Sequence, residues 1–367
     1  MQSYDVIIIG GGAAGSATAL HLCSEGARVC ILEPSNFAQH RVGETIPPDA
    51  NVLLKELGVW DPFLADAHLP CYGSHALWGS NTLGHNDFIT SPHGCGWHLD
   101  RSRFDRTLLS EARAKGASII QQPASNIKFS GNQVTSIGLA DGSSISADMF
   151  VDATGRKTLL SRRLGIKREF TDRQVTLYAR FDCPTEDLGH STWLEAVHYG
   201  WWYAAAVPGD QVVVALGTRP EVAKSLLLSK ASRWASALSA SKIIAPKLAK
   251  AKFRADSLGV TASQSYRVNR ATGKNWLAVG DAASAFDPLS SAGIYKALLT
   301  ARLAAKAITE PSRTNGLETY QLHLDNDYDQ YLIHRQDMYE QENRWPDAFF
   351  WKSMRAVDPV HRDYAVA

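Results

Sequence analysis

Residues 4–33 read YDVIIIGGGAAGSATALHLCSEGARVCILE, and this stretch decides the fold. The apolar, β-branched run at Tyr4–Ile9 predicts a strand, and the glycine turn GGGAAG at residues 10–15 follows it directly. A helix to about Glu25 and a second strand over Arg28–Leu32 come next. This strand–turn–helix–strand order predicts a parallel α/β unit of the kind that binds a dinucleotide.

Each glycine of the turn has its own physical task. Gly10 permits the tight turn, Gly12 lets the backbone approach a pyrophosphate, and Gly15 lets the helix and the strand pack closely. The N-terminus of the helix presents free N–H groups and a partial positive charge to the phosphates. Glu33 ends the second strand, near the spacing of about 20 residues at which a carboxylate meets a ribose hydroxyl.

A later segment predicts a distal anchor for the same ligand. The apolar strand Trp276–Val279 leads into Gly280 and Asp281, and a helix is expected over about 292–307. Asp281 can accept a hydrogen bond from a sugar-alcohol hydroxyl. Free N–H groups near Gly293 can stabilise negative charge on a reduced ring.

Composition narrows the function class. The chain has 367 residues, 45% of them hydrophobic, and a net charge of +1, so it can form a core but lacks the basic excess of a nucleic-acid-binding protein. No apolar run reaches about 18 residues, so we expect no membrane partner. Five scattered cysteines without a CxxC pair favour a reducing, cytoplasmic location. The histidines and cysteines between positions 68 and 98 match no zinc spacing, so we predict no metal site.

Five motifs occur in a fixed order along the chain. GGGAAG with Glu33 comes first, then RVGETIPP at 41–48, DRSRFD at 100–105, DATG at 152–155 and GDAASAFDPLSSAG at 280–293. Over residues 4–310 the sequence thereby resembles the FAD-dependent monooxygenase superfamily, in the branch with tryptophan halogenases and geranylgeranyl-reductase-like oxidoreductases. The resemblance implies an α/β (α+β) fold in which a glutathione-reductase-type FAD domain is interleaved with a β-sheet substrate domain.

The division into domains follows from this resemblance and from the strand-rich texture of the middle of the chain. We expect a discontinuous FAD-binding domain at 1–80, 100–165 and 255–310, a substrate domain at 81–99 and 166–254, and a C-terminal helical segment at 311–367.

The resemblance also implies contacts with FAD along most of the chain. The glycine turn would hold the pyrophosphate, Glu33 the adenosine ribose and Asp281 the ribitol, while residues 288–294 would lie beside the isoalloxazine ring. The complete set expected to bind FAD is Gly10, Gly12, Ala13, Ala14, Gly15, Glu33, Arg41, Gly43, Glu44, Arg101, Ala124, Ala153, Gly155, Gly280, Asp281, Pro288, Gly293 and Ile294.

Two departures separate this chain from the halogenases. Halogenases carry a lysine some way after the GE loop, and here no lysine occurs between Lys55 and Lys115. They also carry a W-x-W-x-I-P motif, whereas residues 203–208 read YAAAVP. The sequence therefore favours hydroxylation of an electron-rich aromatic substrate through a flavin C4a-hydroperoxide over halogenation.

The substrate stays open between several classes. One is a peptidyl tryptophan of a partner quinoprotein oxidase, a precursor protein on its way to cysteine tryptophylquinone. A small-molecule aromatic hydroxylase and a geranylgeranyl-reductase-like reductase of isoprenoid double bonds are the alternatives. The sequence holds one GxGxxG only, so it shows no separate nicotinamide-binding domain. NAD(P)H that binds transiently, or a partner reductase, would supply the electrons. Pocket candidates for a catalytic role are His75, His98, Tyr203 and Asp287.

Overall fold

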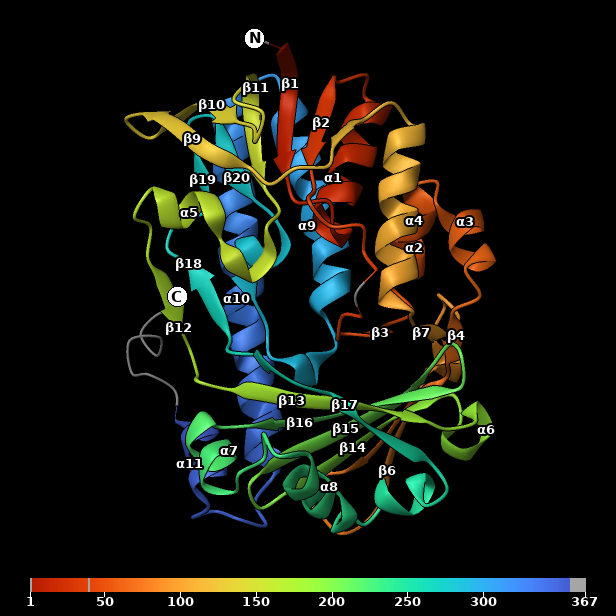
Figure 1. Ribbon diagram of the computed structural model, residues 1–367. Coiled ribbons are helices and arrows are strands. Elements are labelled where there is room, and N and C mark those ends of the chain that lie inside the picture. Colours follow the sequence, from red (N-terminus) through yellow and green to blue (C-terminus); the bar gives the residue numbers. More distant parts are fainter. Residues whose placement is uncertain (1, 39, 357–367) are drawn as a thin grey trace.

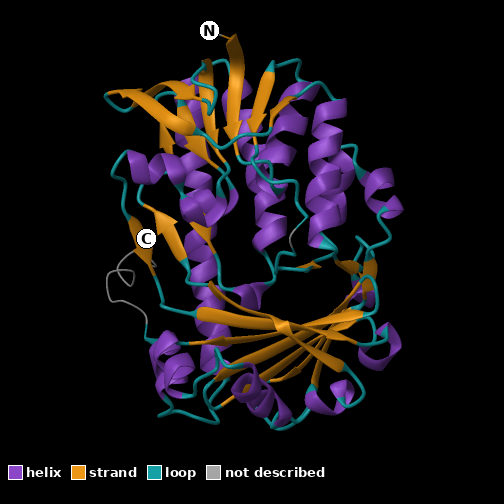
Figure 2. Ribbon diagram, in the orientation of Figure 1, coloured by secondary structure: helices purple, strands orange, loops and turns teal. Residues whose placement is uncertain are grey.

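Two β-sheets, one above the other in Figure 1, organise the chain. The computed structural model describes residues 2–38 and 40–356. The upper region alternates strands with covering helices, and the lower region is a broad antiparallel sheet with short helices beneath it, as Figure 2 shows by colour. The mixed α/β class that the sequence predicts is thereby confirmed.

The upper, eight-stranded sheet is built on β1 (Gln2–Ile9). β1 pairs in parallel with β11 (Ser144–Asp152) and β2 (Val29–Leu32), β11 pairs in parallel with β20 (Trp276–Ala278), and β2 pairs with β8 (Ser118–Ile120). Parallel strands end at one edge of a sheet, and ligands bind outside that edge. Here the edge faces the lower sheet (Figure 1).

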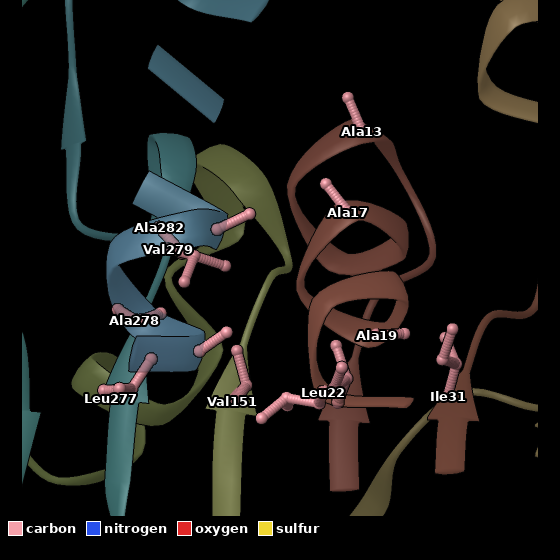
Figure 3. Close-up of a cluster of buried hydrophobic side chains, with 14 of the residues drawn as sticks. Ala13, Ala17, Ala19, Leu22, Ile31, Val151, Leu277, Ala278, Val279 and Ala282 are labelled. Atoms are coloured by element: carbon pink, nitrogen blue, oxygen red, sulfur yellow. The ribbon is translucent and has the colours of Figure 1, made fainter. Parts of the chain in front are cut away.

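Small side chains let the helices approach this sheet closely. Figure 3 shows Leu22 of α1 (Ala13–Ser24) beside Val151 of β11, with Leu277 of β20 on the other side of Val151 and the small Ala17 higher up on α1. Helix α9 (Gly293–Thr309) packs against α1, and α4 (Arg101–Ala114) covers its other side. Burying each branched side chain of the central strands stabilises the fold by about 1.5–3 kcal/mol.

Along each strand of the lower, seven-stranded sheet, side chains point alternately to its two faces. In β15 (Gly200–Val207), Trp202, Ala204 and Ala206 pack downward with Trp234 of α8 (Ala231–Ser239), while Trp201 and Tyr203 point to the opposite face. The strand order is β17 (Lys252–Ala262), β13 (Val175–Asp182), β16 (Gln211–Thr218), β15, β14 (Ser191–Val197), β5 (Gly73–Leu77) and β6 (Gly84–Asp87).

Shorter elements connect and cover the two sheets. The upper sheet is extended by β9 (Ser125–Ser130), β10 (Gln133–Gly138) and β19 (Thr272–Gly273). Two three-stranded sheets consist of β3 (Thr45–Ile46), β7 (Gly96–His98) and β4 (Leu69–Cys71), and of β12 (Arg168–Phe170), β18 (Tyr266–Val268) and β21 (Ser284–Ala285). The remaining helices are α2 (Ala50–Glu56), α3 (Trp60–Ala65), α5 (Leu159–Arg163), α6 (Thr185–Leu188) and α7 (Pro220–Ser225), with the 3-10 turns η1 (Phe88–Thr90), η2 (Gly155–Lys157), η3 (Ala245–Leu248), η4 (Gly280–Ala282) and η5 (Pro288–Ser290).

The C-terminal part is helical and links the two regions. Helix α10 (Arg313–Gln341) runs beside the upper sheet and down to the lower one, where α11 (Phe349–Arg355) caps it (Figure 1). Residues 357–367 of the predicted C-terminal segment lie outside the described residues. No helix within the described ranges is both long and apolar enough to cross a bilayer.

Strand pairing differs from the predicted domain boundaries at two places. β5 and β17 belong to the lower sheet, although the ranges 1–80 and 255–310 assign much of both to the FAD-binding domain. Each strand lies within a few residues of a strand of another sheet, with β4 before β5 and β18 after β17, so the sequence gives no break in texture there. The domain division as such stays a prediction.

Candidate active site

A cavity of about 730 Å³ lies between the two sheets. At one end its wall is the glycine turn and the carboxyl ends of β1, β2 and β11. At the other end its wall is the upper face of the lower sheet, with Trp201, Tyr203 and Ala215. The cavity is therefore continuous from the predicted dinucleotide turn to the strands of the predicted substrate domain.

The glycine turn admits no side chains at two positions. Gly10 has φ +106°, and a Cβ there would lie 2.4 Å from the carbonyl oxygen of Ala153. A Cβ on Gly15 would lie 1.9 Å from the carbonyl oxygen of Gly10. Gly12 precedes α1 without a side-chain cap, so the first N–H groups of the helix are free for an anion. The turn fits a pyrophosphate.

Glu33 is held at the end of β2 by two backbone N–H groups. Its Oε2 accepts from Gly11 at 2.7 Å and its Oε1 accepts from Ser35 at 2.8 Å. The side chain is buried but lines the cavity. A carboxylate fixed in this way retains lone pairs for a ribose hydroxyl.

Two arginines share one buried carboxylate beside the turn. Asp105 is fully buried, and its Oδ2 lies 3.3 Å from Arg41 Nη1 and 3.2 Å from Arg101 Nη2. Arg101 also donates to the carbonyls of residues 42–43, which fixes that loop. Arg41 Nη1 lies 3.8 Å from where a Cβ of Gly12 would stand. Two cations against one anion leave a net positive charge, which suits a diphosphate.

A buried lysine fixes the distal acidic residue. Lys296 of α9 is 2% exposed and its Nζ lies 3.1 Å from Asp281 Oδ1. It also donates to the carbonyl of Ser284, and burial lowers its pKa. Asp281 lines the cavity, so its second oxygen is available to a hydroxyl group. Beside Gly293, at the start of α9, no atom would contact an added Cβ.

The sheet end of the cavity presents neutral polar groups. The hydroxyls of Tyr203 and Thr45 are hydrogen-bonded at 2.7 Å, and burial raises the pKa of Tyr203 well above its ordinary value. Burial also raises the pKa of Glu44, whose Oε1 has no hydrogen-bond partner among the described residues. The hydroxyls of Thr176 and Ser263 line the cavity and are likewise unpartnered within the described chain. These groups can orient an uncharged ring.

Asp287 belongs to a buried polar network. Its Oδ2 accepts from Tyr339 at 2.7 Å and its Oδ1 from Gln174 at 3.1 Å. Arg335 lies 3.3 Å from Asp172 and 3.7 Å from Asp287. Burial raises the pKa of Asp287, and the positive charge of Arg335 opposes that change. The network ties the loop after Phe286 to helix α10.

Most of the residues predicted to bind FAD meet at this cavity. All of that set line it except Gly15 and Gly280. These two pack behind the wall, where Gly15 faces the carbonyl of Gly10 and a Cβ on Gly280 would lie 3.0 Å from Ala14. Their part in cofactor binding, like that of the lining residues, stays a prediction.

The four predicted catalytic candidates divide equally. Tyr203 and Asp287 line the cavity, whereas His75 and His98 lie outside its wall. His75 pairs with His85 across two strands, at 2.7 Å between their Nδ1 atoms, and His98 is fully buried with Nε2 3.0 Å from Thr192. Strand alternation sends these rings away from the cavity. In the described ranges, no group of three or more metal-ligating side chains occurs.

His98 predicts a pH dependence of stability. Burial lowers its pKa to about 4, against about 6.5 in an unfolded chain, so the unfolded state binds the proton first. Stability is therefore lost as the pH falls from about 6.5 to 4, by about 3 kcal/mol for this residue. Urea unfolding at pH 7 and pH 4 measures the loss. We expect it to shrink by that amount in His98→Gln and to persist in the exposed control His198→Gln; equal losses in both variants would contradict this account.

Comparisons with known proteins agree with this geometry. The tryptophan halogenase family profile matches residues 74–365, and an FAD-dependent oxidoreductase profile matches residues 5–44. The putative FAD-dependent oxidoreductase LodB of Marinomonas mediterranea is 32% identical over 366 residues, which are 98% of this chain and 99% of LodB.

Two solved structures share the fold. The myxobacterial chondrochloren halogenase CndH superposes with a TM-score of 0.88 at 24% identity, over 99% of this chain and 88% of that one. The peptidyl tryptophan dihydroxylase QhpG, essential for tryptophylquinone cofactor biogenesis, superposes with a TM-score of 0.78 at 23% identity, over 96% of this chain and 79% of that one. On the profile match and the full-length similarity to LodB, the chain belongs to the tryptophan halogenase family and is an FAD-dependent oxidoreductase.

Proposed function

We propose that this flavoenzyme is a monooxygenase that hydroxylates an electron-rich aromatic ring, and that the ring is a tryptophan side chain of a precursor quinoprotein oxidase. The observation that carries the proposal is the character of the sheet end of the cavity. Tyr203, Thr45, Thr176 and Ser263 supply hydroxyl groups there, and burial raises the pKa of Glu44. Among the described residues, one lysine lines the cavity. It is Lys157, which lies in the η2 turn and is exposed.

The chain's own residues would divide the work. The free N–H groups of α1, with Arg41 and Glu33, would hold the adenine-dinucleotide half of FAD, and Asp281 would hold the ribitol. Reduced FAD supplies the activation of O₂ and the transfer of one oxygen atom. Trp201 and Phe286 would keep water from the substrate ring.

Tyr203 and Thr45 are the groups placed to handle a proton. Their hydroxyls are 2.7 Å apart at the cavity wall, and Tyr203 is neutral because burial raises its pKa. A neutral phenol can donate a hydrogen bond to an oxygen that develops negative charge. The Tyr203 hydroxyl would thereby stabilise the oxygen left behind when the other oxygen atom of O₂ passes to the ring.

Tryptophan as the substrate is supported by one solved structure. QhpG, which shares the fold, is named for its action on peptidyl tryptophan. A halogenase activity is less consistent with the residues, because no lysine occurs between Lys55 and Lys115. We propose NAD(P)H as the source of electrons, used directly or through a partner reductase.

Mass spectrometry tests the proposal. The FAD-loaded protein is incubated with a tryptophan-containing precursor oxidase, NADH, a flavin reductase, O₂ and sodium chloride. We expect one precursor tryptophan to gain the mass of one or two oxygen atoms, and the gain to fall about a hundredfold in Tyr203→Phe. Gain of the mass of chlorine, or oxygenation of free indole with an unchanged precursor, would overturn it. An exposed tyrosine variant, Tyr72→Phe, is the matched control.

A further inference from the structure

A line of aromatic side chains in mutual contact leaves the cavity at its sheet end. It begins at Trp201, which lines the cavity and whose Nε1 donates to the hydroxyl of Tyr339 at 3.2 Å. The ring of Tyr339 lies 6.0 Å from that of Trp351, centroid to centroid. Trp351 stacks on Trp345 at 6.1 Å with an interplanar angle of 22°.

Burial changes along this line in one direction. Trp201 is 2% exposed, and Tyr339 and Trp351 are fully buried. Trp345, in the loop before α11, is partly exposed. Trp78, also partly exposed, contacts both buried rings, at 5.2 Å from Trp351 and 6.2 Å from Tyr339, centroid to centroid. The line therefore joins the cavity wall to the solvent through two buried rings.

The second member of the line has a proton acceptor. Tyr339 donates its hydroxyl hydrogen to Asp287 Oδ2 at 2.7 Å. The guanidinium of Arg335 lies over the Tyr339 ring, 4.7 Å from its centroid, and pairs with Asp287. A phenol loses an electron far more readily when a base takes its proton at the same time. Tyr339 is thus built to be oxidised and reduced reversibly.

We propose that a line of four residues carries oxidising equivalents, one electron at a time, from the cavity to the protein surface. The four are Trp201, Tyr339, Trp351 and Trp345. The proposal rests on the proposed function in one respect, since a one-electron oxidant derived from O₂ must arise in the cavity when no substrate is bound. Trp201 reduces that oxidant by giving up one electron. Tyr339 then reduces Trp201 and passes its proton to Asp287.

The remaining steps return every residue to its starting state. Trp351 reduces Tyr339, which takes its proton back from Asp287. Trp345 reduces Trp351, and a thiolate in solution reduces Trp345 by one electron. The thiyl radical that results joins a second one to form a disulfide. In sum one electron moves from the thiolate to the oxidant, and no side chain in the cavity is consumed.

A second aromatic cluster in the same sheet serves as a comparison, because it packs in the core without a link to the cavity. Trp202 and Trp234 lie 5.2 Å apart on the opposite face of β15, and Trp234 stacks on Phe253 at 5.5 Å. Neither tryptophan lines the cavity, and the indole nitrogens of both lack a hydrogen-bond partner among the described residues. This cluster ends in a phenylalanine and includes no tyrosine–carboxylate pair.

Flash photolysis of the FAD-loaded protein, without substrate, tests the proposal. A blue pulse absorbed by bound FAD removes one electron from a neighbouring aromatic residue, and the lifetime of the tryptophan radical is followed by its absorbance. The variants are made in a Trp78→Phe background, because Trp78 lies 6.2 Å from Tyr339 and offers the charge a second route to the surface. In that background we expect Trp351→Phe to shorten the lifetime about tenfold, because the charges recombine when the line is broken. Trp351→Tyr, which also loses the Nε1 hydrogen bond to Val197 but can be oxidised, should restore it. The control Trp234→Phe should leave it unchanged.

Peptide mapping gives the second readout. After continuous blue light in air, wild-type protein should carry its oxidised tryptophans at Trp345 and Trp78, whereas the protein with both Trp78→Phe and Trp351→Phe should carry them at Trp201. Equal lifetimes with and without Trp351→Phe in the Trp78→Phe protein, or a loss of equal size in Trp351→Tyr, would overturn the proposal. If Trp351 variants fail to fold, Trp345→Phe in the same background replaces them, with oxidation expected at Trp351. No hydroxylation is needed here, so this test and the precursor assay fail independently.

Discussion

Replacing Gly15 by alanine should abolish FAD binding and lower the free energy of unfolding by about 3 kcal/mol. In an ordinary helix the same change is favourable by about 1 kcal/mol, because glycine is a poor helix former. Here the added Cβ would stand 1.9 Å from the carbonyl oxygen of Gly10 and 3.0 Å from Ala153. One contact is to the turn itself and the other is to the loop after β11, so α1 can make room only by moving away from β1 and β11.

The flavin absorbance after gel filtration and urea unfolding measure the two effects. Gly26→Ala is the matched control, because Gly26 ends α1 with φ +82° and no atom lies near an added Cβ. That variant should lose about 1–2 kcal/mol from the left-handed backbone and retain its FAD. Full flavin content in Gly15→Ala would show that close contact between helix and turn is not what forms the binding site.

Replacing Arg335 by methionine should lower the free energy of unfolding by about 3–5 kcal/mol. Arg335 is the cation between Asp172 and Asp287, at 3.3 and 3.7 Å, and all three side chains are buried. Methionine fills most of the volume but leaves two carboxyl groups together without a positive charge. The loss should be largest at high pH, because burial raises the pKa of Asp287 and Arg335 no longer opposes that change, so the native state keeps a proton that the unfolded state releases.

Urea unfolding between pH 5 and pH 8 measures this loss. Arg28→Met is the control, since Arg28 pairs with Asp5 at 2.7 Å but its side chain is 67% exposed, and the loss there should be far smaller and independent of pH over this range. A similar loss in both variants, or one that does not grow with pH, would contradict a role of Arg335 as the buried counter-ion.

Local patterns in the sequence account for the part of the site that they determine. The glycine turn, Glu33 and Asp281 sit at strand ends, and strand ends in a parallel sheet must meet at one edge. For this reason residues from 10 to 294 line one cavity. Periodicity also predicts the helix α9.

No motif or periodicity in the sequence predicts the contacts that the C-terminal helix α10 makes. Arg335 and Tyr339 reach Asp287 only because α10 crosses both regions, and neither a motif nor a spacing marks them. The only sequence feature around Arg335 and Tyr339 is a run of tyrosines and charged residues in a helix of weak amphipathicity. The sequence also does not predict on which face of their sheets His75 and His98 lie. That face depends on strand register, and register is set by partner strands that are distant in sequence.

The early position of β5 in the chain has a consequence for synthesis. Its parallel partner β14 begins only at Ser191, so at ribosomal speeds β5 and β6 leave the exit tunnel on the order of ten seconds before the strand that covers them exists. During that interval the nascent hairpin is an open template for wrong pairing with other chains. Yield in a foreign host should therefore depend on translation rate and chaperone supply more than on the stability of the finished protein.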